Sequence, residues 1–195
     1  MFCDIDRVLI PADRIAQRVR ELAGQITRDH VEPNLPADSQ ITIVPILTGA
    51  MIFCADLIRE MPVRMKIGLL SVSSYPGTST ASTGPTLQAN SLGEIRGRHV
   101  LLVDDILDSG ETIKMIVPLL KDSGAATVKT CVLLRKDRPS ARAVKADYIG
   151  FDIPDEFVVG YGLDYDNYYR NLPDIVTLRR EILDRTGSEL LNSTV

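Results

Sequence analysis

Apolar residues in this chain follow two alternating patterns, short continuous runs and runs with a period of three to four residues. Continuous runs rich in Val, Ile and Leu are typical of strands buried in a parallel sheet. They predict strands at residues 41–47, 63–73, 99–103, 127–134, 148–151 and 157–159. The helical period predicts a first helix that begins at Pro11, with Ile15, Val19, Leu22 and Ile26 on its apolar face, and further helices over 50–61, 111–122 and 177–185.

The alternation of strands with helices predicts an α/β fold built on a doubly wound, mainly parallel sheet. A chain of 195 residues can bury a sizeable core, and we expect residues 1–195 to form a single domain. Residues 1–40 and 150–195 are expected to form a small hood beside the sheet. Residues 74–93 are rich in Ser, Thr, Gly and Pro and lack periodicity, which predicts a long functional loop or lid.

The charge balance narrows the classes of function. The chain has 22 basic and 26 acidic residues and a net charge of -4. Because no broad basic surface is available, non-specific binding of nucleic acid is disfavoured. A polyanionic ligand would have to be held by local backbone amides, a few cationic side chains and Mg²⁺.

Cysteine spacing and hydropathy indicate the compartment. Cys3, Cys54 and Cys131 form no closely spaced pair. The two inner ones, Cys54 and Cys131, lie within apolar segments, which predicts buried thiols in a reducing environment. The first residues contain no apolar signal core, and no apolar run approaches the roughly 20 residues that span a bilayer. We therefore expect a cytoplasmic protein without a membrane partner.

Residues 100–112 contain a strand, two carboxylates and a loop of small residues in direct succession. Asp104 and Asp105 follow the apolar run, at the end of the strand where α/β sheets bind their ligands. The loop can offer successive backbone N–H groups, a helix N-terminus and two hydroxyls to a phosphate. Its candidate phosphate ligands are Ser109, Gly110, Glu111 and Thr112. The stretch predicts a site for a phosphorylated sugar, with the acidic pair facing hydroxyls or a cation.

Residues 100–112 have two alternative interpretations. One is an ordinary strand-turn-helix connection in which Asp108 or Ser109 caps the helix. The other is the acidic pocket of a phosphorelay receiver domain, where paired Asp residues normally close the first strand. Here at least two further strands are predicted before Asp104. The complete succession therefore favours the sugar-phosphate site.

Several segments show a family resemblance. Residues 100–112 resemble the ribose 5-phosphate loop of the type I phosphoribosyltransferases, which use 5-phosphoribosyl 1-pyrophosphate. A second resemblance is to the purine pocket of the hypoxanthine-guanine phosphoribosyltransferase family. It involves Lys136 and the segments 153–165 (Ile-Pro-Asp-Glu-Phe-Val-Val-Gly-Tyr-Gly-Leu-Asp-Tyr) and 170–173 (Arg-Asn-Leu-Pro). The similarity extends from about residue 11 to residue 178.

The resemblance implies a type I phosphoribosyltransferase-like fold in which the hood segments contribute to the purine pocket. It implies a Mg²⁺-dependent enzyme of purine salvage that transfers the 5-phosphoribosyl group from 5-phosphoribosyl 1-pyrophosphate to hypoxanthine or guanine. The products would be IMP or GMP and pyrophosphate. The resemblance also implies a homodimer or homotetramer.

Roles at the purine follow from the same resemblance. Phe157 matches an aromatic residue that stacks on the base, and Val158 matches a residue whose backbone groups meet the base edge. Lys136 matches a lysine that donates to the purine 6-oxygen, and Asp108 matches the proposed base for the N7 proton. Lysine has donors only, so Lys136 favours a 6-oxopurine over adenine, whose 6-amino group is itself a donor. Taken singly, Lys136 is compatible with a solvated charge and Phe157 with a core position.

Further roles concern the ribose and the pyrophosphate. Asp164 matches a carboxylate that reaches a Mg²⁺ on the pyrophosphate, and Arg170 matches a pyrophosphate contact. Asp104 and Asp105 match the pair that faces the ribose hydroxyls and a second Mg²⁺.

Two loops complete the expected site. Thr48 and Gly49 lie in a strand-to-helix turn that resembles the family's pyrophosphate loop. That loop commonly carries Lys where Thr48 stands, so pyrophosphate affinity or its salt dependence is expected to differ. Ser74 and Tyr75 resemble the Ser-Tyr pair of a mobile catalytic lid, whose closure would exclude water from the reaction.

A second departure from the family follows Lys136. Relatives often carry Arg four residues later, where this chain has Ser140. Arg138 or Arg142 is expected to substitute for it.

Two rival functions remain. One is a xanthine-preferring phosphoribosyltransferase. The sequence does not rank hypoxanthine against guanine, because the two bases differ at C2, a position that the resemblance implies is contacted mainly by backbone atoms near Val158. The other is an RNA-binding regulator of pyrimidine genes, which shares the fold and the phosphate loop but needs a basic surface facing RNA. The net charge of -4 and the segment 153–165 disfavour the regulator.

Overall fold

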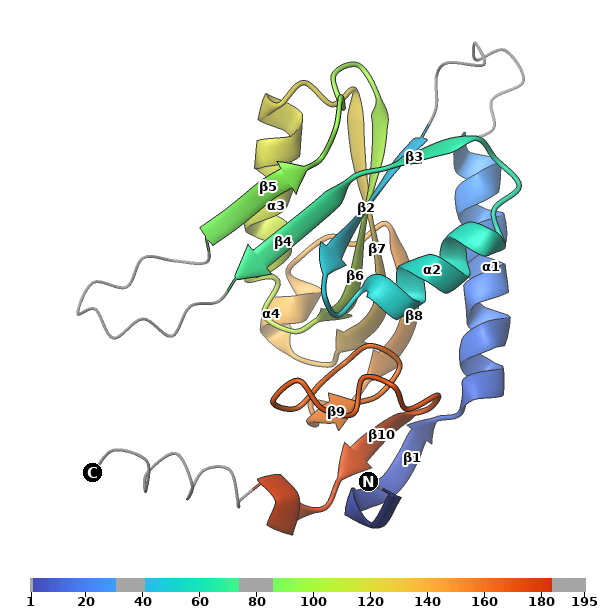
Figure 1. The fold of residues 1–195 in the computed structure, drawn as a ribbon, viewed down its shortest axis with the longest axis vertical. Coiled ribbons are helices and arrows are strands. Elements are labelled where there is room, and N and C mark those ends of the chain that lie inside the picture. Colours follow the sequence, from blue (N-terminus) through green and yellow to red (C-terminus); the bar gives the residue numbers. More distant parts are fainter. Residues whose placement is uncertain (1, 31–40, 74–85, 184–195) are drawn as a thin grey trace, which may run out of the picture.

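A computed structural model describes the fold of residues 2–30, 41–73 and 86–183 (Figure 1). The elements follow in the order β1 (Ile5–Ile10), α1 (Ala12–His30), β2 (Ile41–Leu47), α2 (Met51–Arg59), β3 (Met65–Ile67), β4 (Leu69–Ser73), β5 (Thr86–Ser91), β6 (His99–Leu107), α3 (Glu111–Asp122), β7 (Thr127–Lys136), α4 (Pro139–Arg142), β8 (Tyr148–Ile153), β9 (Val158–Val159) and β10 (Ile175–Leu178). None of the helices within these ranges is long and apolar enough to cross a membrane.

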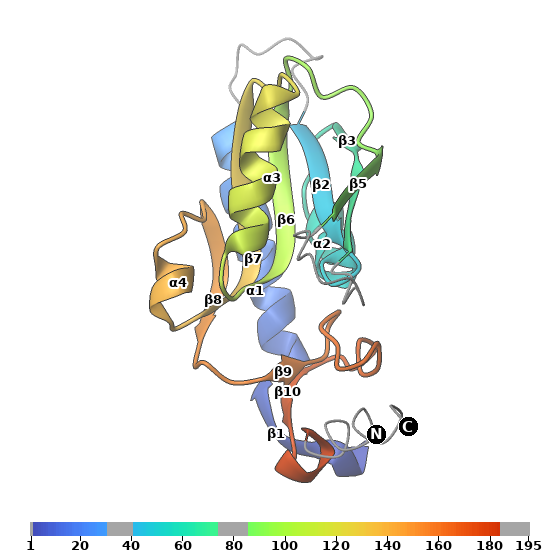
Figure 2. The same ribbon diagram turned by 90° about the vertical axis from the view of Figure 1, so that its left-hand side faces the viewer.

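The larger sheet has the predicted mainly parallel arrangement. Its strands pair in the order β5-β4-β2-β6-β7-β8, with β3 also beside β2. Neighbouring strands are parallel except β4 and β5, which are antiparallel. Helices α1 and α2 cover one face and α3 covers the other (Figure 1 and Figure 2). The prediction of a doubly wound sheet is confirmed.

Alternate side chains of β6 fill the two sides of the core. Leu101 and Val103 pack with the residues of α1 and α2, whereas Val100 and Leu102 pack with Ile116 of α3. A strand covered on both faces is apolar along its whole length, which explains the continuous run in the sequence. The predicted apolar face of α1 is also buried, and it consists of Ile15, Val19, Leu22 and Ile26.

A small antiparallel sheet forms the expected hood. Its strands pair in the order β1-β10-β9, so segments from the two ends of the described chain lie side by side. Ile10 lies opposite Ile175, and Val176 lies opposite Val159. In Figure 1 the hood lies at the lower end of the molecule, toward which the arrow of β2 points. Since β2, β6 and β7 are parallel, the hood faces the carboxyl ends of all three strands.

The prediction of one strand over residues 63–73 is wrong at Gly68. The Gly68 N–H donates to Ile43 O at 2.9 Å, and a Cβ at Gly68 would lie 2.7 Å from Leu92 O. This close approach of backbones separates β3 from β4. Part of the loop predicted at residues 74–93 is the edge strand β5. The sequence does not predict this strand, because its residues are mostly polar and its pairing with β4 rests on backbone hydrogen bonds.

The strand that carries the acidic pair is longer than predicted. Its pairing with β7 continues to Leu107, so Asp104 and Asp105 lie within β6 near its end instead of after it.

The helix predicted over residues 177–185 begins too early. Thr177 belongs to β10, where the β-branched run from Ile175 to Thr177 pairs with β1 on one side and β9 on the other. Helical backbone begins only at residue 180.

Candidate active site

Two adjoining hollows lie where the parallel strands end and the hood begins. The larger is a cleft of about 650 Å³, and the smaller is a pocket of about 160 Å³. Both are lined by Asp105, Ile106, Asp108 and Asp164. The cleft is also lined by Ile46, Leu47, Thr48, Gly49, Ser71, Asp104, Thr112, Asn167 and Arg170. The pocket is also lined by Lys136, Phe157, Val158 and Leu163.

Asp104 and Asp105 form a carboxylate pair at the floor of the cleft. Asp104 is only 8% exposed, and its Oδ1 accepts a hydrogen bond of 3.1 Å from the backbone N–H of Asp105. Burial raises the pKa of Asp104 well above its ordinary value, and the charge of Asp105 raises it further. Burial also raises the pKa of Asp105. A cation beside the pair would oppose both shifts, because it favours the ionised carboxylates.

The turn between β2 and α2 packs directly on this pair. A Cβ at Gly49 would lie 1.8 Å from Asp105 Oδ2, so this turn needs a residue without a side chain. A Cβ at Gly162 of the hood would lie 2.3 Å from Gly49 O. The adjacent residue, Thr48, is exposed in the cleft, and the Leu47–Thr48 peptide bond is cis.

The loop after β6 leads into an uncapped helix N-terminus. Gly110 has φ 79° and precedes α3 without a side-chain cap. Ser109 Oγ accepts only a long hydrogen bond of 3.4 Å from Glu111 N–H, and the Asp108 carboxylate is engaged elsewhere. Of the two residues that an ordinary connection would use as caps, Ser109 therefore makes only this long contact, and Asp108 pairs with Lys136. Thr112 lines the cleft, and the N–H groups of the first turn of α3 can bind an anion.

The smaller pocket contains an open aromatic face and a nearly buried ammonium. Phe157 is 44% exposed, so it is not a core residue, and its ring meets the Tyr165 ring edge-on at 5.4 Å between centroids. Val158 is buried in β9. Lys136 lies at the end of β7, and its side chain is 11% exposed.

Lys136 and Arg138 alternate with two carboxylates in a closed group of four charges. Lys136 Nζ lies 3.1 Å from Asp108 Oδ2 and 3.5 Å from Asp155 Oδ1. Arg138 Nη1 pairs with Asp108 Oδ1, and Arg138 Nη2 lies 3.1 Å from Asp155 Oδ2. Burial raises the pKa of Asp108, but hydrogen bonds from Arg138 and Lys136 outweigh it and leave this pKa below its ordinary value.

Arg138 and Arg142, the two arginines expected to substitute near Ser140, have different partners. Arg142 Nε pairs with Asp137 Oδ1 at 2.7 Å, on the exposed side of the α4 turn. Arg138 instead reaches the residues around the pocket.

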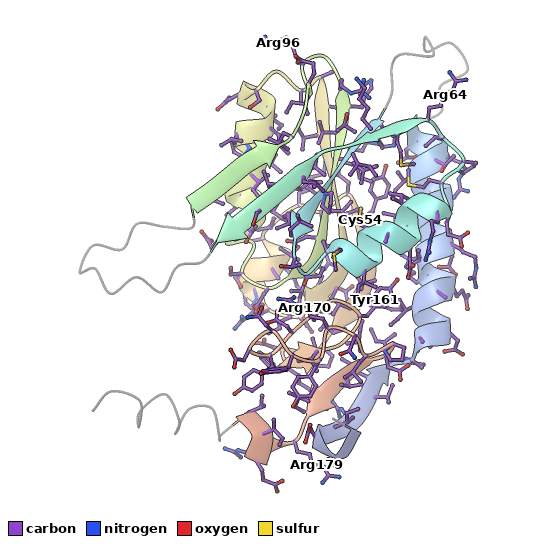
Figure 3. The ribbon with its side chains drawn as sticks, in the orientation of Figure 1. Cys54, Arg64, Arg96, Tyr161, Arg170 and Arg179 are labelled. Carbon is purple, nitrogen blue, oxygen red and sulfur yellow. The ribbon has the colours of Figure 1, made fainter. Side chains whose placement is uncertain are left out.

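Arg170 joins the hood to the cleft, at the boundary between hood and central sheet in Figure 3. Its Nη1 donates to Gly162 O at 2.8 Å, and its Nη2 pairs with Asp164 Oδ1 at 2.8 Å. Asp164 Oδ2 accepts a hydrogen bond of 2.9 Å from the backbone N–H of Asn167. The expected pyrophosphate contact and the expected metal ligand are thus paired with each other. Among the described residues that line the cleft, Arg170 is the one cation.

Two site residues were missed in the sequence, and two predicted ones are not described. Asn167 lines the cleft with φ 64°, and Asp155 completes the group of four charges. Asn adopts the left-handed region more readily than most residues, so the Asp-Asn pair at 166–167 could have signalled a tight turn here. Ser74 and Tyr75 lie outside the described residues.

The acidic residues suit a hard cation only in part. Within the described ranges no group of three or more His, Cys, Asp or Glu side chains is arranged to hold a metal. Mg²⁺ is commonly bound through one or two carboxylates together with substrate phosphates, and Asp104 with Asp105 supplies such a pair of oxygen ligands. The donor set therefore fits Mg²⁺ that arrives with a phosphorylated ligand.

Comparison with known proteins agrees with this geometry. A family profile described as the phosphoribosyl transferase domain matches residues 10–166. The hypoxanthine-guanine phosphoribosyltransferase of Streptococcus pneumoniae is 40% identical over 181 residues, covering 92% of this chain and 96% of the relative. That of Bacillus subtilis is 39% identical over 184 residues, covering 93% and 97%. A mutant hypoxanthine phosphoribosyltransferase from Trypanosoma cruzi, solved with the product IMP, has a TM-score of 0.83 at 34% identity, covering 94% of this chain and 95% of its own.

Proposed function

Because this chain belongs to the phosphoribosyltransferase family and is a phosphoribosyltransferase, we propose that it acts in purine salvage on hypoxanthine and guanine. The reaction transfers the 5-phosphoribosyl group of 5-phosphoribosyl 1-pyrophosphate to the base, giving IMP or GMP and pyrophosphate. The observation that carries the proposal is the position of Lys136 Nζ in a pocket that shares four lining residues with the cleft for the sugar phosphate.

Base recognition rests on the shape and donors of the smaller pocket. The exposed face of Phe157 offers a stacking surface, and Lys136 offers donors without acceptors at one edge. A 6-oxopurine satisfies these donors, whereas the amino group of adenine would leave donor against donor. Backbone groups near Val158 would contact the C2 side of the ring, where hypoxanthine, guanine and xanthine differ.

The transfer is a displacement at C1′ of the ribose by N9 of the base. The loop from Ser109 to Thr112 would anchor the 5′-phosphate through backbone N–H groups, so that C1′ is held between pocket and cleft. Asp108 lines both hollows and would accept the N7 proton as the new bond forms. Arg170 would contact the leaving pyrophosphate.

Mg²⁺ belongs to the proposal as a partner of the acidic residues. Asp104 and Asp105 would hold one ion together with the ribose hydroxyls, and Asp164 would hold another at the pyrophosphate. The ions would supply positive charge to the leaving group. Ser74 and Tyr75 would close over the site and exclude water, which otherwise competes with the base for C1′.

The proposed assembly is a cytoplasmic homodimer or homotetramer of a single phosphoribosyltransferase domain over residues 1–195, in which segments 1–40 and 150–195 contribute to the hood and purine pocket. Light scattering after size-exclusion chromatography tests the oligomeric part of this proposal.

The function is tested by nucleotide formation with Mg²⁺ and 5-phosphoribosyl 1-pyrophosphate, with hypoxanthine, guanine and xanthine in separate reactions. We expect turnover of hypoxanthine and guanine and much slower turnover of xanthine. Preferred use of xanthine would assign the enzyme to the rival specificity. A gel shift with RNA is expected to be negative; specific RNA binding without nucleotide formation would establish the regulator instead.

A further inference from the structure

Arg138 does not line the base pocket but pairs with Asp108, which does. Among the described residues, neither Arg138 nor Asp155 lines the pocket or the cleft, whereas Asp108 lines both and Lys136 lines the pocket. The guanidinium of Arg138 nevertheless joins Asp108, in the loop after β6, to Asp155, in the segment after β8. It therefore connects the phosphate loop to the segment that leads into Phe157.

Lys136 has two competing sets of partners. Its Nζ contacts Asp108 at 3.1 Å and Asp155 at 3.5 Å, and its side chain is only 11% exposed. A purine 6-oxygen would take one of the three donors of Nζ and leave the other two to the carboxylates, and any movement of Nζ toward the base would lengthen its contacts with them. A carboxylate left without a cation in this half-buried position is costly, so purine binding depends on what neutralises Asp108 and Asp155 afterwards.

We propose that Arg138 is a positioning residue for base recognition, which holds Asp108 and Asp155 together and keeps both carboxylates paired when Lys136 turns to the purine. The proposal rests on the proposed function, because it concerns the same lysine and the same base. It identifies a specificity role for an arginine two positions after Lys136.

The chemistry of the guanidinium suits this role. Its planar fork places Nη1 on one carboxylate and Nη2 on the other in a fixed arrangement. An ammonium would have to hold both carboxylates from a single nitrogen. The hydrogen bonds from Arg138 also help to keep the pKa of Asp108 below its ordinary value, against the effect of burial. Charged groups around this carboxylate come from several elements, and they are Lys136, Arg138, Asp155, Asp105 and Asp164.

The test measures binding of IMP and of ribose 5-phosphate, which lacks the base, to the parent and to Arg138→Gln. The expected result is a rise of about three- to tenfold in the Kd for IMP relative to the Kd for ribose 5-phosphate. Arg142→Gln is the matched control, because it removes the same charge from the same turn, where Arg142 pairs with Asp137. We expect the control to keep the parental ratio.

A pH profile separates this role from a merely structural one. In Arg138→Gln, Asp108 loses a donor, so its pKa rises and the acid limb of kcat/KM for hypoxanthine moves up by about half a pH unit. Arg138→Lys restores the charge without the fork, so its IMP ratio is expected to lie between those of the parent and Arg138→Gln. A structural defect alone would lower the melting temperature and weaken both ligands equally.

The double variant Arg138→Gln with Asp155→Asn gives an independent test. Lys136 then has one carboxylate fewer to leave, so the loss of IMP affinity is expected to be smaller than in Arg138→Gln alone. An unchanged IMP ratio in Arg138→Gln, an equal change in Arg142→Gln, or a larger loss in the double variant would overturn the inference. If the parent failed to bind IMP at all, the proposed function itself would fall.

Discussion

The two ends of the proposed active site differ in how their charges are paired. The base end, defined by Asp108, Lys136, Arg138 and Asp155, has two cations and two anions in mutual contact. The pyrophosphate end consists of Thr48, Gly49, Asp104, Asp105, Asp164 and Arg170. There Arg170 is already paired with Asp164, and the buried pair of Asp104 and Asp105 has raised pKa values. One end is neutralised by the protein itself and the other is not.

This difference matches the ligands proposed for the two ends. A neutral purine needs donors held in a fixed direction, and a network of paired charges provides them. A pyrophosphate carries several negative charges, and a mostly acidic lining repels it unless Mg²⁺ binds between them. Thr48 adds no charge to this lining and Arg170 is the one cation among the described lining residues, so we expect pyrophosphate binding to depend strongly on Mg²⁺.

The largest expected effect comes from the base end. Asp108→Asn is expected to lower kcat by about 10²–10⁴, because Asn preserves the shape of the side chain but does not accept the N7 proton. Single-turnover rates with hypoxanthine measure this loss. Asp155 still pairs with Lys136 and Arg138 in this variant, so the protein is expected to stay folded, which the melting temperature checks. A near-parental rate would reject the catalytic role.

Lys136→Gln is expected to reduce selection between hypoxanthine and adenine by about 10–100-fold, because Gln can present either a donor or an acceptor to position 6. The measurement is the ratio of kcat/KM for the two bases. Arg142→Gln again serves as the control, since its charge lies outside the pocket. If the mutant kept the parental ratio, Lys136 would not be contacting that atom.

Gly49→Ala tests how closely the pyrophosphate end is packed. The new Cβ would lie 1.8 Å from Asp105 Oδ2, so either the turn or the carboxylate has to move, at a cost of about 1–3 kcal/mol in stability. We expect about a tenfold loss in kcat/KM for 5-phosphoribosyl 1-pyrophosphate. Gly24→Ala in α1 is the control, because its nearest neighbour would be Arg28 Nη1 at 3.4 Å. Equal behaviour of the two variants would show that the contact with Asp105 does not matter.

The variant with the smallest expected effect reduces the difference in charge between the two ends. Thr48→Lys adds a cation at the pyrophosphate end, and we expect tighter binding of Mg-pyrophosphate by about 1 kcal/mol or less. Calorimetric titration at two ionic strengths should show a smaller gain at high salt. Ala126→Lys is the control, because it adds the same charge at the opposite end of the sheet, before β7. Unchanged affinity of Thr48→Lys at low salt would contradict this expectation.

The sequence predicts best where one local pattern decides the structure. The buried strands β2 and β7 and the helices α1 and α3 were found because their apolar periodicity reflects burial. Strand β1 was missed, because Asp6, Arg7 and Val8 are exposed and its pairing partner β10 lies far along the chain. The prediction of a helix over 177–185 fails for the same reason, since only the contacts with β1 and β9 make residues 175–178 a strand.

In the candidate site, too, residues in local motifs can be predicted, whereas contacts between distant segments cannot. The types and order of Asp104, Asp105, Lys136 and Phe157 could be interpreted from the sequence, because each stands beside a recognisable strand or motif. The pairing of Arg138 with carboxylates from two different loops depends on the folded arrangement, as does the contact between Arg170 and Asp164.

A competition assay tests the central claim most directly. The parent protein is given 5-phosphoribosyl 1-pyrophosphate with equal amounts of hypoxanthine and adenine, with Mg²⁺ in one reaction and a chelator in the other. The account predicts IMP and pyrophosphate in equal amounts in the Mg²⁺ reaction, little AMP, and almost no product with the chelator. Formation of AMP in preference to IMP, or equal turnover without the divalent ion, would contradict it.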